Sequence, residues 1–288
     1  MKKTLLSIFI FLYFPICSQD YSDRHFVLPS PGENSGMFSV FTTVMGFLEF
    51  YDQHQCSGIK IDFGEAGLYY DSNRGPNWWN YYFEPVEVVQ SSALEIHILP
   101  RKLKRAFTKR GSRGLTVKEG YSLIQKYIKI KPGLQEKIHS FVETYFGNSN
   151  VIGVHYRGTD KHSEAPRVPY EKVKEALQKV IDSSSSEEYK IFVATDEKPF
   201  LDFISRHFAG KVIYIDALRS VDGKGVHQIY KNCYKMGEDA VMDCILLSKC
   251  SILIRTASNL SRCAGYFNPE LPIIDLNFLY VERRKGDW

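Results

Sequence analysis

The chain has 288 residues, of which 44% are hydrophobic and 24% are charged, and its formal net charge is +4. This composition is ordinary for a globular protein, and the length allows two domains with cores of their own. So small a positive charge argues against a nucleic-acid partner. It would suit an anionic small molecule but does not by itself indicate one.

The N-terminus has the layout of a secretory signal peptide. Lys2 and Lys3 precede an apolar run from Leu5 to Cys17, which is followed by Ser18. Because a membrane-spanning helix needs ~20 apolar residues, we predict that residues 1–18 are a signal peptide or a short anchor. This predicts the secretory pathway (endoplasmic reticulum or Golgi lumen) or, in a bacterium, an exported or membrane-anchored protein. Membrane contact would then occur only through this segment, if it is not cleaved. The alternative is a buried first helix or strand.

Residues 19–148 form the first predicted domain, an α/β unit. Its predicted elements are a helix at 37–50, a strand at 59–63, and helices at 117–128 and 134–146. The aromatic cluster Trp78–Phe83 is flanked by turn residues, which predicts a loop. We expect these rings to lie in the core rather than to form a platform for a sugar.

Residues 149–288 form the second predicted domain, which begins after the turn cluster Gly147–Asn150. Short apolar runs alternate here with segments of helical periodicity. The predicted strands are 151–155, 190–195, 212–215, 252–254 and 272–274. The predicted helices follow Pro169 and Pro199 and cover 239–248 and 259–267. This alternation predicts a parallel sheet with right-handed crossovers, which is a Rossmann-like α/β fold.

Five cysteines follow the N-terminal segment, and no two of them form a Cys-x-x-Cys pair. That spacing argues against a structural zinc site. The pattern leaves open whether two of the C-terminal four form a disulfide or all of them are core thiols.

Three polar loops follow predicted strands of the second domain. The first is His155–Lys161 with Glu164 just beyond, the second is Ala194–Glu197, and the third is Arg255–Asn259, preceded along the chain by the helical Asp243. In a parallel sheet such loops share one edge, which is where ligands bind in open α/β folds. An arginine, hydroxyls and helix N-termini at this edge suit a nucleotide diphosphate.

The first loop, His155-Tyr-Arg-Gly-Thr-Asp-Lys161, resembles the His-x-Arg-Arg/Gly-Thr-Asp-Lys motif of the α1,6-fucosyltransferase superfamily. That superfamily includes the nodulation fucosyltransferases and, more distantly, protein O-fucosyltransferases. The second and third loops follow in the order of the family's other motifs, so the resemblance covers about residues 150–268. It implies a GT-B fold, GDP-fucose as the donor, and inverting transfer to a glycan, protein or other hydroxyl acceptor without a metal.

The resemblance also assigns roles to single residues. Arg157 would hold the β-phosphate of GDP, His155 would contact the phosphate or ribose, and Asp243 would accept from the guanine edge. Thr256 and Ser258 would cap the diphosphate or stabilise the loop. The remaining predicted donor-binding residues are Asp196 and Asn259. Gly158 stands where the animal enzymes have a second arginine, which bears on the donor sugar and on the acceptor.

The predicted chemistry needs no cofactor besides the donor substrate. The sequence contains no Asp-x-Asp triplet, the usual metal-binding pair of metal-dependent transferases, so arginine, lysine and helix N-termini would have to offset the diphosphate charge. Inverting transfer requires a carboxylate that deprotonates the acceptor hydroxyl. Glu164 is the first candidate for this base and Asp160 the second, with Arg157 completing the predicted catalytic residues.

Other interpretations stay open at this point. Arg157 with Asp160 could be a structural ion pair, and Thr195–Glu197 could be an ordinary helix N-cap. Asp243 lies on an apolar helix face, so we expect a buried, hydrogen-bonded carboxylate whichever function holds. The alternatives to fucosyl transfer are the transfer of another GDP-sugar and a non-catalytic GT-B-like protein that binds glycans or a partner.

Overall fold

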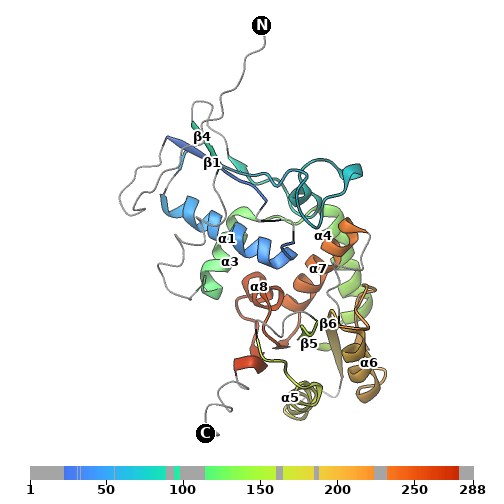
Figure 1. Cartoon of the computed structure of the whole chain (residues 1–288). Helices are drawn as coiled ribbons and strands as arrows, with labels where there is room; N and C mark the ends of the chain where they lie inside the picture. Colours follow the sequence, from blue (N-terminus) through green and yellow to red (C-terminus); the bar gives the residue numbers. More distant parts are fainter. Residues whose placement is uncertain are drawn as a thin grey trace.

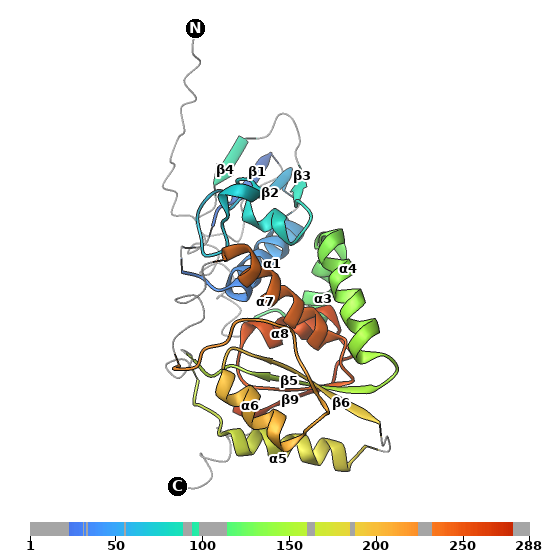
Figure 2. The ribbon, with the colours of Figure 1, turned by 90° about the vertical axis from the view of Figure 1, so that its right-hand side faces the viewer.

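The computed structural model describes residues 23–30, 32, 34–54, 56–88, 94–97, 114–159, 165–184, 188–223 and 232–278. Two sheets lie at opposite ends of this part of the chain, and helices fill the space between them (Figure 1). Figure 2 shows further helices on the outer face of the C-terminal sheet. The chain is therefore layered as sheet, helices, sheet and helices. The predicted signal segment and the residues after 278 lie outside the described residues.

The N-terminal sheet has the strand order β3-β2-β1-β4. The strands are β1 (Arg24–Leu28), β2 (Gly58–Ile61), β3 (Glu87–Val88) and β4 (Leu94–His97). β1 pairs in parallel with β2 and β4, whereas β3 is antiparallel to β2. Only β2 was predicted, because β3 has two residues, β4 has four, and β1 carries no alternation of polar and apolar residues.

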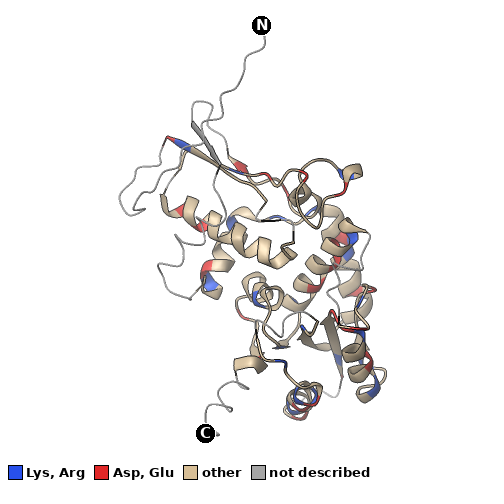
Figure 3. Cartoon of the chain, viewed as in Figure 1, with Lys and Arg blue, Asp and Glu red and all other residues tan. Residues whose placement is uncertain are grey.

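One long helix, α1 (Met37–His54), lies beneath this sheet and is mostly buried. It carries almost no charge, unlike the outer helices of the C-terminal half (Figure 3). The helix α3 (Val117–Tyr127) begins at a capping box, in which Thr116 and Glu119 satisfy each other's backbone N–H groups. Next comes α4 (Pro132–Phe141), which continues into a π-helical turn at Val142–Phe146. All three predicted helices of this half are confirmed.

The aromatic cluster is core, as predicted, but it is not a loop. Trp78–Tyr81 form the short 3₁₀ helix η2, which Asn77 caps by accepting from Trp79 N. The rings of Trp79 and Phe83 stack with their centroids 4.3 Å apart, and both side chains are fully buried. The cap and the packed rings give regular structure to a segment that its turn residues marked as irregular.

The C-terminal sheet is parallel throughout, with strand order β7-β6-β5-β8-β9. Its strands are β5 (Asn150–Tyr156), β6 (Tyr189–Thr195), β7 (Val212–Ile213), β8 (Ile252–Arg255) and β9 (Ile273–Asp275). The predicted parallel sheet is thus confirmed. Gly147 ends the preceding turn at φ 54°, a left-handed conformation that favours glycine.

Two pairs of helices cover the faces of this sheet (Figure 2). α5 (Tyr170–Asp182) and α6 (Lys198–His207) lie on the outer face, and α7 (Cys233–Ser248) and α8 (Asn259–Phe267) on the inner face. α7 begins six residues earlier than the predicted 239–248. Asn232 caps it by accepting from Lys235 N at 2.9 Å, and the polar residues of the first turns conceal the helical pattern.

The inner helices join both halves in one core. Side chains from α1, α3, α7 and α8 form a single buried cluster that reaches both sheets, while a second cluster fills the outer face of the C-terminal sheet. Successive residues of β5 alternate between these clusters, as Val151 faces the first and Ile152 the second. Cys56, Cys233, Cys244, Cys250 and Cys263 are all free thiols. Within the described ranges, no helix combines the length and hydrophobicity that crossing a bilayer requires.

Candidate functional site

A cleft of about 380 Å³ lies where the first turn of α1 meets the carboxyl ends of β5 and β6 and the start of α8. Both halves of the chain line it. Of the residues predicted to bind the donor, those that line the cleft are His155, Arg157, Asp196, Asp243, Ser258 and Asn259. The structure thus brings together side chains that are far apart in the sequence, at the edge where parallel strands end.

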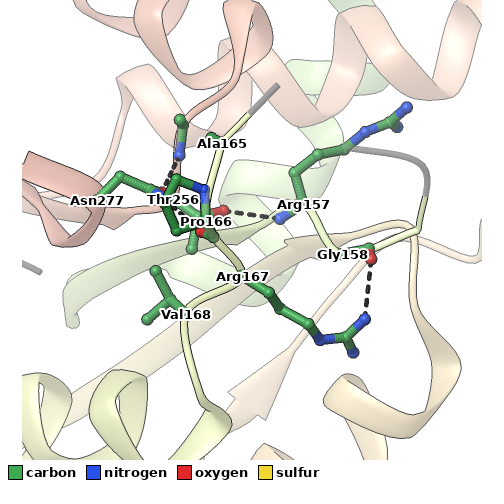
Figure 4. A pocket seen from close by; sticks show the side chains of 9 residues that line it. Arg157, Gly158, Ala165, Pro166, Arg167, Val168, Thr256 and Asn277 are labelled. Atoms are coloured by element: carbon green, nitrogen blue, oxygen red, sulfur yellow. Dashed lines mark hydrogen bonds between the residues drawn. The ribbon is translucent and has the colours of Figure 1, made fainter. Parts of the chain in front are cut away.

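Arg157 is the first residue after β5, and its backbone and side chain are both held. Its N–H donates to Thr256 Oγ1 at 2.9 Å, and its guanidinium Nη1 lies 2.9 Å from Asp196 Oδ2. The guanidinium extends away from the neighbouring Arg167 (Figure 4) and keeps 27% of its side-chain surface exposed. A cation at the cleft whose backbone is fixed and whose guanidinium is partly exposed is suited to bind an anion.

Asp196 organises the loop that carries this arginine. Besides the ion pair with Arg157, its carboxylate accepts from Gly158 N at 3.1 Å and from Thr159 Oγ1 at 2.6 Å. Both of its oxygens are therefore engaged by the 157–159 loop. Asp196 lines the cleft as predicted, but these bonds give it a positioning role rather than that of an open ligand contact.

His155 precedes Arg157 by two residues and is buried at the cleft. Burial lowers its pKa to about 3, and the nearby positive charges of Arg157 and Arg255 contribute to the same shift. Its Nδ1 has no hydrogen-bond partner among the described residues. At neutral pH this side chain is an uncharged imidazole, which can form a hydrogen bond with a ligand but cannot neutralise a phosphate.

Asp243 faces the cleft from α7. Burial raises its pKa to about 8, against the opposing effect of the Arg219 charge and with a further increase from the neighbouring Asp239. Arg219 donates to the carbonyls of Ala217 and Ile215 at 2.9 Å each. The expectation of a hydrogen-bonded carboxylate is wrong for Asp243 Oδ1, which has no partner within the described chain. This leaves an acceptor at the cleft wall for a ligand.

Asp239 also lines the cleft and was missed by the sequence reasoning. It lies one helical turn before Asp243, is 5% exposed, and forms an ion pair with Lys235. The four-residue spacing of the two aspartates was the available signal, since it places both on one face of a helix. Two carboxylates on this wall make it an acceptor-rich surface.

The residues of the third loop mainly hold other parts of the site in place. Thr256 is buried beneath Arg157, and Ser258 caps α8 by accepting from Leu260 N at 3.2 Å. Asn277 holds the same loop, since its Oδ1 accepts from Ala257 N at 2.6 Å. Of the two roles considered for Thr256, capping the diphosphate or stabilising the loop, its contact with Arg157 N favours the second.

Gly158 is packed too closely for any side chain. A Cβ there would lie 2.2 Å from the carboxyl carbon of Glu197. Glu197 is buried and paired with Arg167 at 3.0 Å, and Tyr170 donates to it at 2.7 Å. Arg167 also donates to the Gly158 carbonyl at 3.0 Å (Figure 4). This chain therefore fills the space beside residue 158 with Glu197.

The N-terminal half contributes a wall that the sequence reasoning did not assign. Residues 34–39, Leu68 and Tyr69 line the same cleft as Arg157. Met37 N donates to Tyr69 Oη at 2.6 Å at the first turn of α1. Burial raises the pKa of Tyr69 to about 12, while the Met37 bond and the Arg157 charge act in the opposite direction. A turn of apolar and small residues carries no chemical signal, so only the fold reveals this wall.

The two candidate bases, Glu164 and Asp160, lie outside the described residues. Within the ranges that are described, no three His, Cys, Asp or Glu side chains gather in a group that could hold a metal ion.

Comparison with protein-family models and with curated protein sequences finds no match. Solved structures do match. The fucosyltransferase NodZ from Bradyrhizobium superposes with a TM-score of 0.62 and 19% identity over 88% of this chain and 95% of that chain. NodZ α-1,6-fucosyltransferase soaked with GDP-fucose gives 0.62 and 18% over 89% and 96%. A variant of FUT1 from Arabidopsis thaliana in complex with GDP gives 0.54 and 10% over 90% and 71%. The chain therefore has the GT-B fold of these fucosyltransferases, as the motif resemblance predicted.

Proposed function

We propose that this protein is a glycosyltransferase that moves fucose from GDP-fucose to a hydroxyl group of a glycan or other acceptor. The observation that carries the proposal is the position of Arg157, fixed at the end of β5 and exposed to a two-walled cleft. Its support is a fold shared with fucosyltransferases whose structures contain GDP or GDP-fucose.

In this proposal each wall of the cleft recognises one part of the donor. Arg157 offsets the diphosphate charge, and a charge-assisted hydrogen bond of this kind contributes about 1.5–3 kcal/mol. Asp243 offers its unpartnered oxygen to the N–H groups of the base. The neutral His155 forms a hydrogen bond with the donor near its phosphate or ribose.

We further propose that transfer inverts the anomeric carbon and proceeds without a metal. A carboxylate removes the proton from the acceptor hydroxyl as that oxygen attacks the anomeric carbon, and GDP leaves with the bonding electrons. The candidate base is Glu164, with Asp160 second. Positive charge at Arg157 stabilises the negative charge that develops on the departing diphosphate.

The test is the release of GDP from GDP-fucose by the purified chain, with EDTA present, against a panel of glycan acceptors. We expect acceptor-dependent release that Arg157→Ala reduces at least tenfold and that Glu164→Gln abolishes. Arg206→Ala is the matched control, because Arg206 lies on the outer helix α6, where it donates to the carbonyl of Asp202. The proposal would be contradicted if no acceptor of the panel stimulated GDP release, or if Arg157→Ala left the release unchanged.

A further inference from the structure

The first turns of α7 form a specific contact with the N-terminal half. The Tyr82 hydroxyl donates to the backbone carbonyl of Tyr234 at 2.9 Å. The two rings stack with centroids 5.5 Å apart and an interplanar angle of 19°. Tyr82 is fully buried, so its hydroxyl bond is shielded from water. In Figure 2 one end of α7 correspondingly lies beside the cyan segment of the N-terminal half.

Two cations complete this contact. The Arg74 guanidinium carbon lies 3.5 Å from the centroid of the Tyr234 ring, a cation–π geometry. On the other side of the network, Tyr234 Oη donates to Glu238 Oε1 at 2.9 Å, and Lys137 Nζ lies 2.6 Å from the same oxygen. The Glu238 carboxylate is buried and would be costly to leave unpaired. Arg74 thus attaches α7 to the N-terminal half of the chain, and Lys137 attaches it to α4.

Gly237 makes the close approach possible. A Cβ at this position would lie 2.2 Å from the Tyr82 hydroxyl oxygen and 2.9 Å from Met37 Cε. Met37 is itself a wall residue of the cleft. The same point of α7 therefore contacts both the buried tyrosine and the N-terminal wall of the cleft.

The rest of α7 carries the opposite wall. Asp239 and Asp243 line the cleft, and Asp243 lies about 13 Å along the helix from Tyr234 at 1.5 Å per residue. Because the helix is rigid, the position of its first turn determines the positions of the side chains further along it. The contact at Tyr82 and Tyr234 therefore determines where these carboxylates lie relative to Met37 and Arg157.

We propose that Tyr82 is a positioning residue for nucleotide binding, and that it acts by holding α7 in register with the N-terminal wall. We name its contacts with Tyr234 and Gly237 the α7 junction. The proposal rests on the proposed function, in that the ligand of the cleft is a guanosine diphosphate. It differs from a direct contact, since Tyr82 does not itself line the cleft described above.

The test is the dissociation constant for GDP, measured by calorimetry on the full chain and on Tyr82→Phe. This change keeps the stacked ring and removes one buried hydrogen bond, so we expect GDP affinity to fall about fivefold. Tyr127→Phe is the control: its hydroxyl bonds Asp52 at the far end of α1, about 22 Å along that helix from the cleft. It should change the dissociation constant less than twofold.

A double-substitution cycle distinguishes positioning from a general loss of stability. Substitutions this far apart normally have additive effects. If the junction acts through Asp243, Tyr82→Phe should change GDP affinity less than twofold in an Asp243→Asn background. Gly237→Ala is an independent arm, for which we expect a larger loss than for Tyr82→Phe in a chain that still melts cooperatively.

The outcomes separate the two proposals. Failure of the unaltered chain to bind GDP would overturn both the function and the junction. If the unaltered chain binds GDP and both Tyr82→Phe and Gly237→Ala bind it with the same affinity, the junction alone is overturned. The junction is also overturned if the fold losses of GDP affinity caused by Tyr82→Phe and Asp243→Asn multiply in the double variant.

Discussion

Two carboxyl groups that line the cleft, Asp196 and Asp243, are in opposite states. Asp196, on the loop after β6, accepts from Gly158, Thr159 and Arg157, so the loop that carries the arginine is built by the protein's own bonds. Asp243, on α7, keeps one oxygen without a partner and has a raised pKa because it is buried. One wall is assembled before any ligand arrives, whereas the other retains an acceptor that a ligand can satisfy. We therefore expect Asp196 to stabilise the Arg157 loop and Asp243 to contact the ligand.

The largest expected effect is the loss of stability when Asp196 is removed. Asp196→Ala removes the ion pair with Arg157 and the acceptors of the Gly158 N–H and the Thr159 hydroxyl, so the free energy of unfolding should fall by about 3 kcal/mol. At pH 4, where the folded protein holds the Asp243 carboxyl neutral, Asp243→Asn should cost less than about 1 kcal/mol, since the unpartnered oxygen makes no bond to lose. Chemical denaturation measures both. Asp202→Ala on the surface of α6 is the control, because that ion pair is exposed. Equal losses for Asp196 and Asp243 would contradict the comparison.

A second substitution tests how tightly the assembled wall is packed. Gly158→Ala would place a methyl group against the Glu197 carboxylate, and we expect it to lower the free energy of unfolding by about 2 kcal/mol. Gly133→Ala on α4 meets nothing within 4 Å. Alanine favours a helix over glycine, so this control should be neutral or stabilising by up to about 1 kcal/mol. Thermal melts should show a lowered melting temperature for Gly158→Ala and an unchanged or raised one for Gly133→Ala, and equal shifts would argue against a packed wall.

The pH dependence of stability tests the state of the other wall. Because the folded-state pKa of Asp243 is raised to about 8 from 3.8, the folded protein holds this proton more tightly than the unfolded chain. The associated stability is fully present below pH 4 and is lost as the pH rises towards 8, by at most about 1.4 kcal/mol per pH unit.

Comparison with Asp243→Asn isolates this effect, because the substituted side chain does not titrate. The shift of His155 has the opposite sign, since a folded-state pKa of about 3 adds stability as the pH rises towards 6.5. That contribution is common to both proteins. If the stability difference between them stays constant from pH 5 to pH 8, the carboxylate of Asp243 is not held in its neutral form.

The same contrast explains how much the sequence predicts. Buried strands that end in polar loops identify the Arg157 loop, because an apolar run followed by charged residues is a local pattern. The pairing of Asp196 with Arg157 is not local, since it depends on β5 and β6 lying side by side. The N-terminal wall is harder still, because Met37 and Tyr69 have no chemical signature and meet only through the packing of α1.

The elements follow the same rule. Strands of seven residues such as β5 and β6 were predicted, but β3 has two residues and is paired only at Val88 and Glu87. Pairing of so short a strand is decided by its neighbours and not by its own sequence. The start of α7 was missed because its first turns contact Tyr82 and, through Glu238, Lys137, which places polar residues where a helix core would be apolar.

The most direct test of the central claim is a calorimetric titration of the purified chain with GDP, UDP and CMP, without added metal and with EDTA present. We expect selective binding of GDP that is lost in Arg157→Ala and retained in Arg206→Ala, with both variants folded. A folded chain that binds none of the three nucleotides, or that binds GDP equally well without the Arg157 side chain, would contradict it.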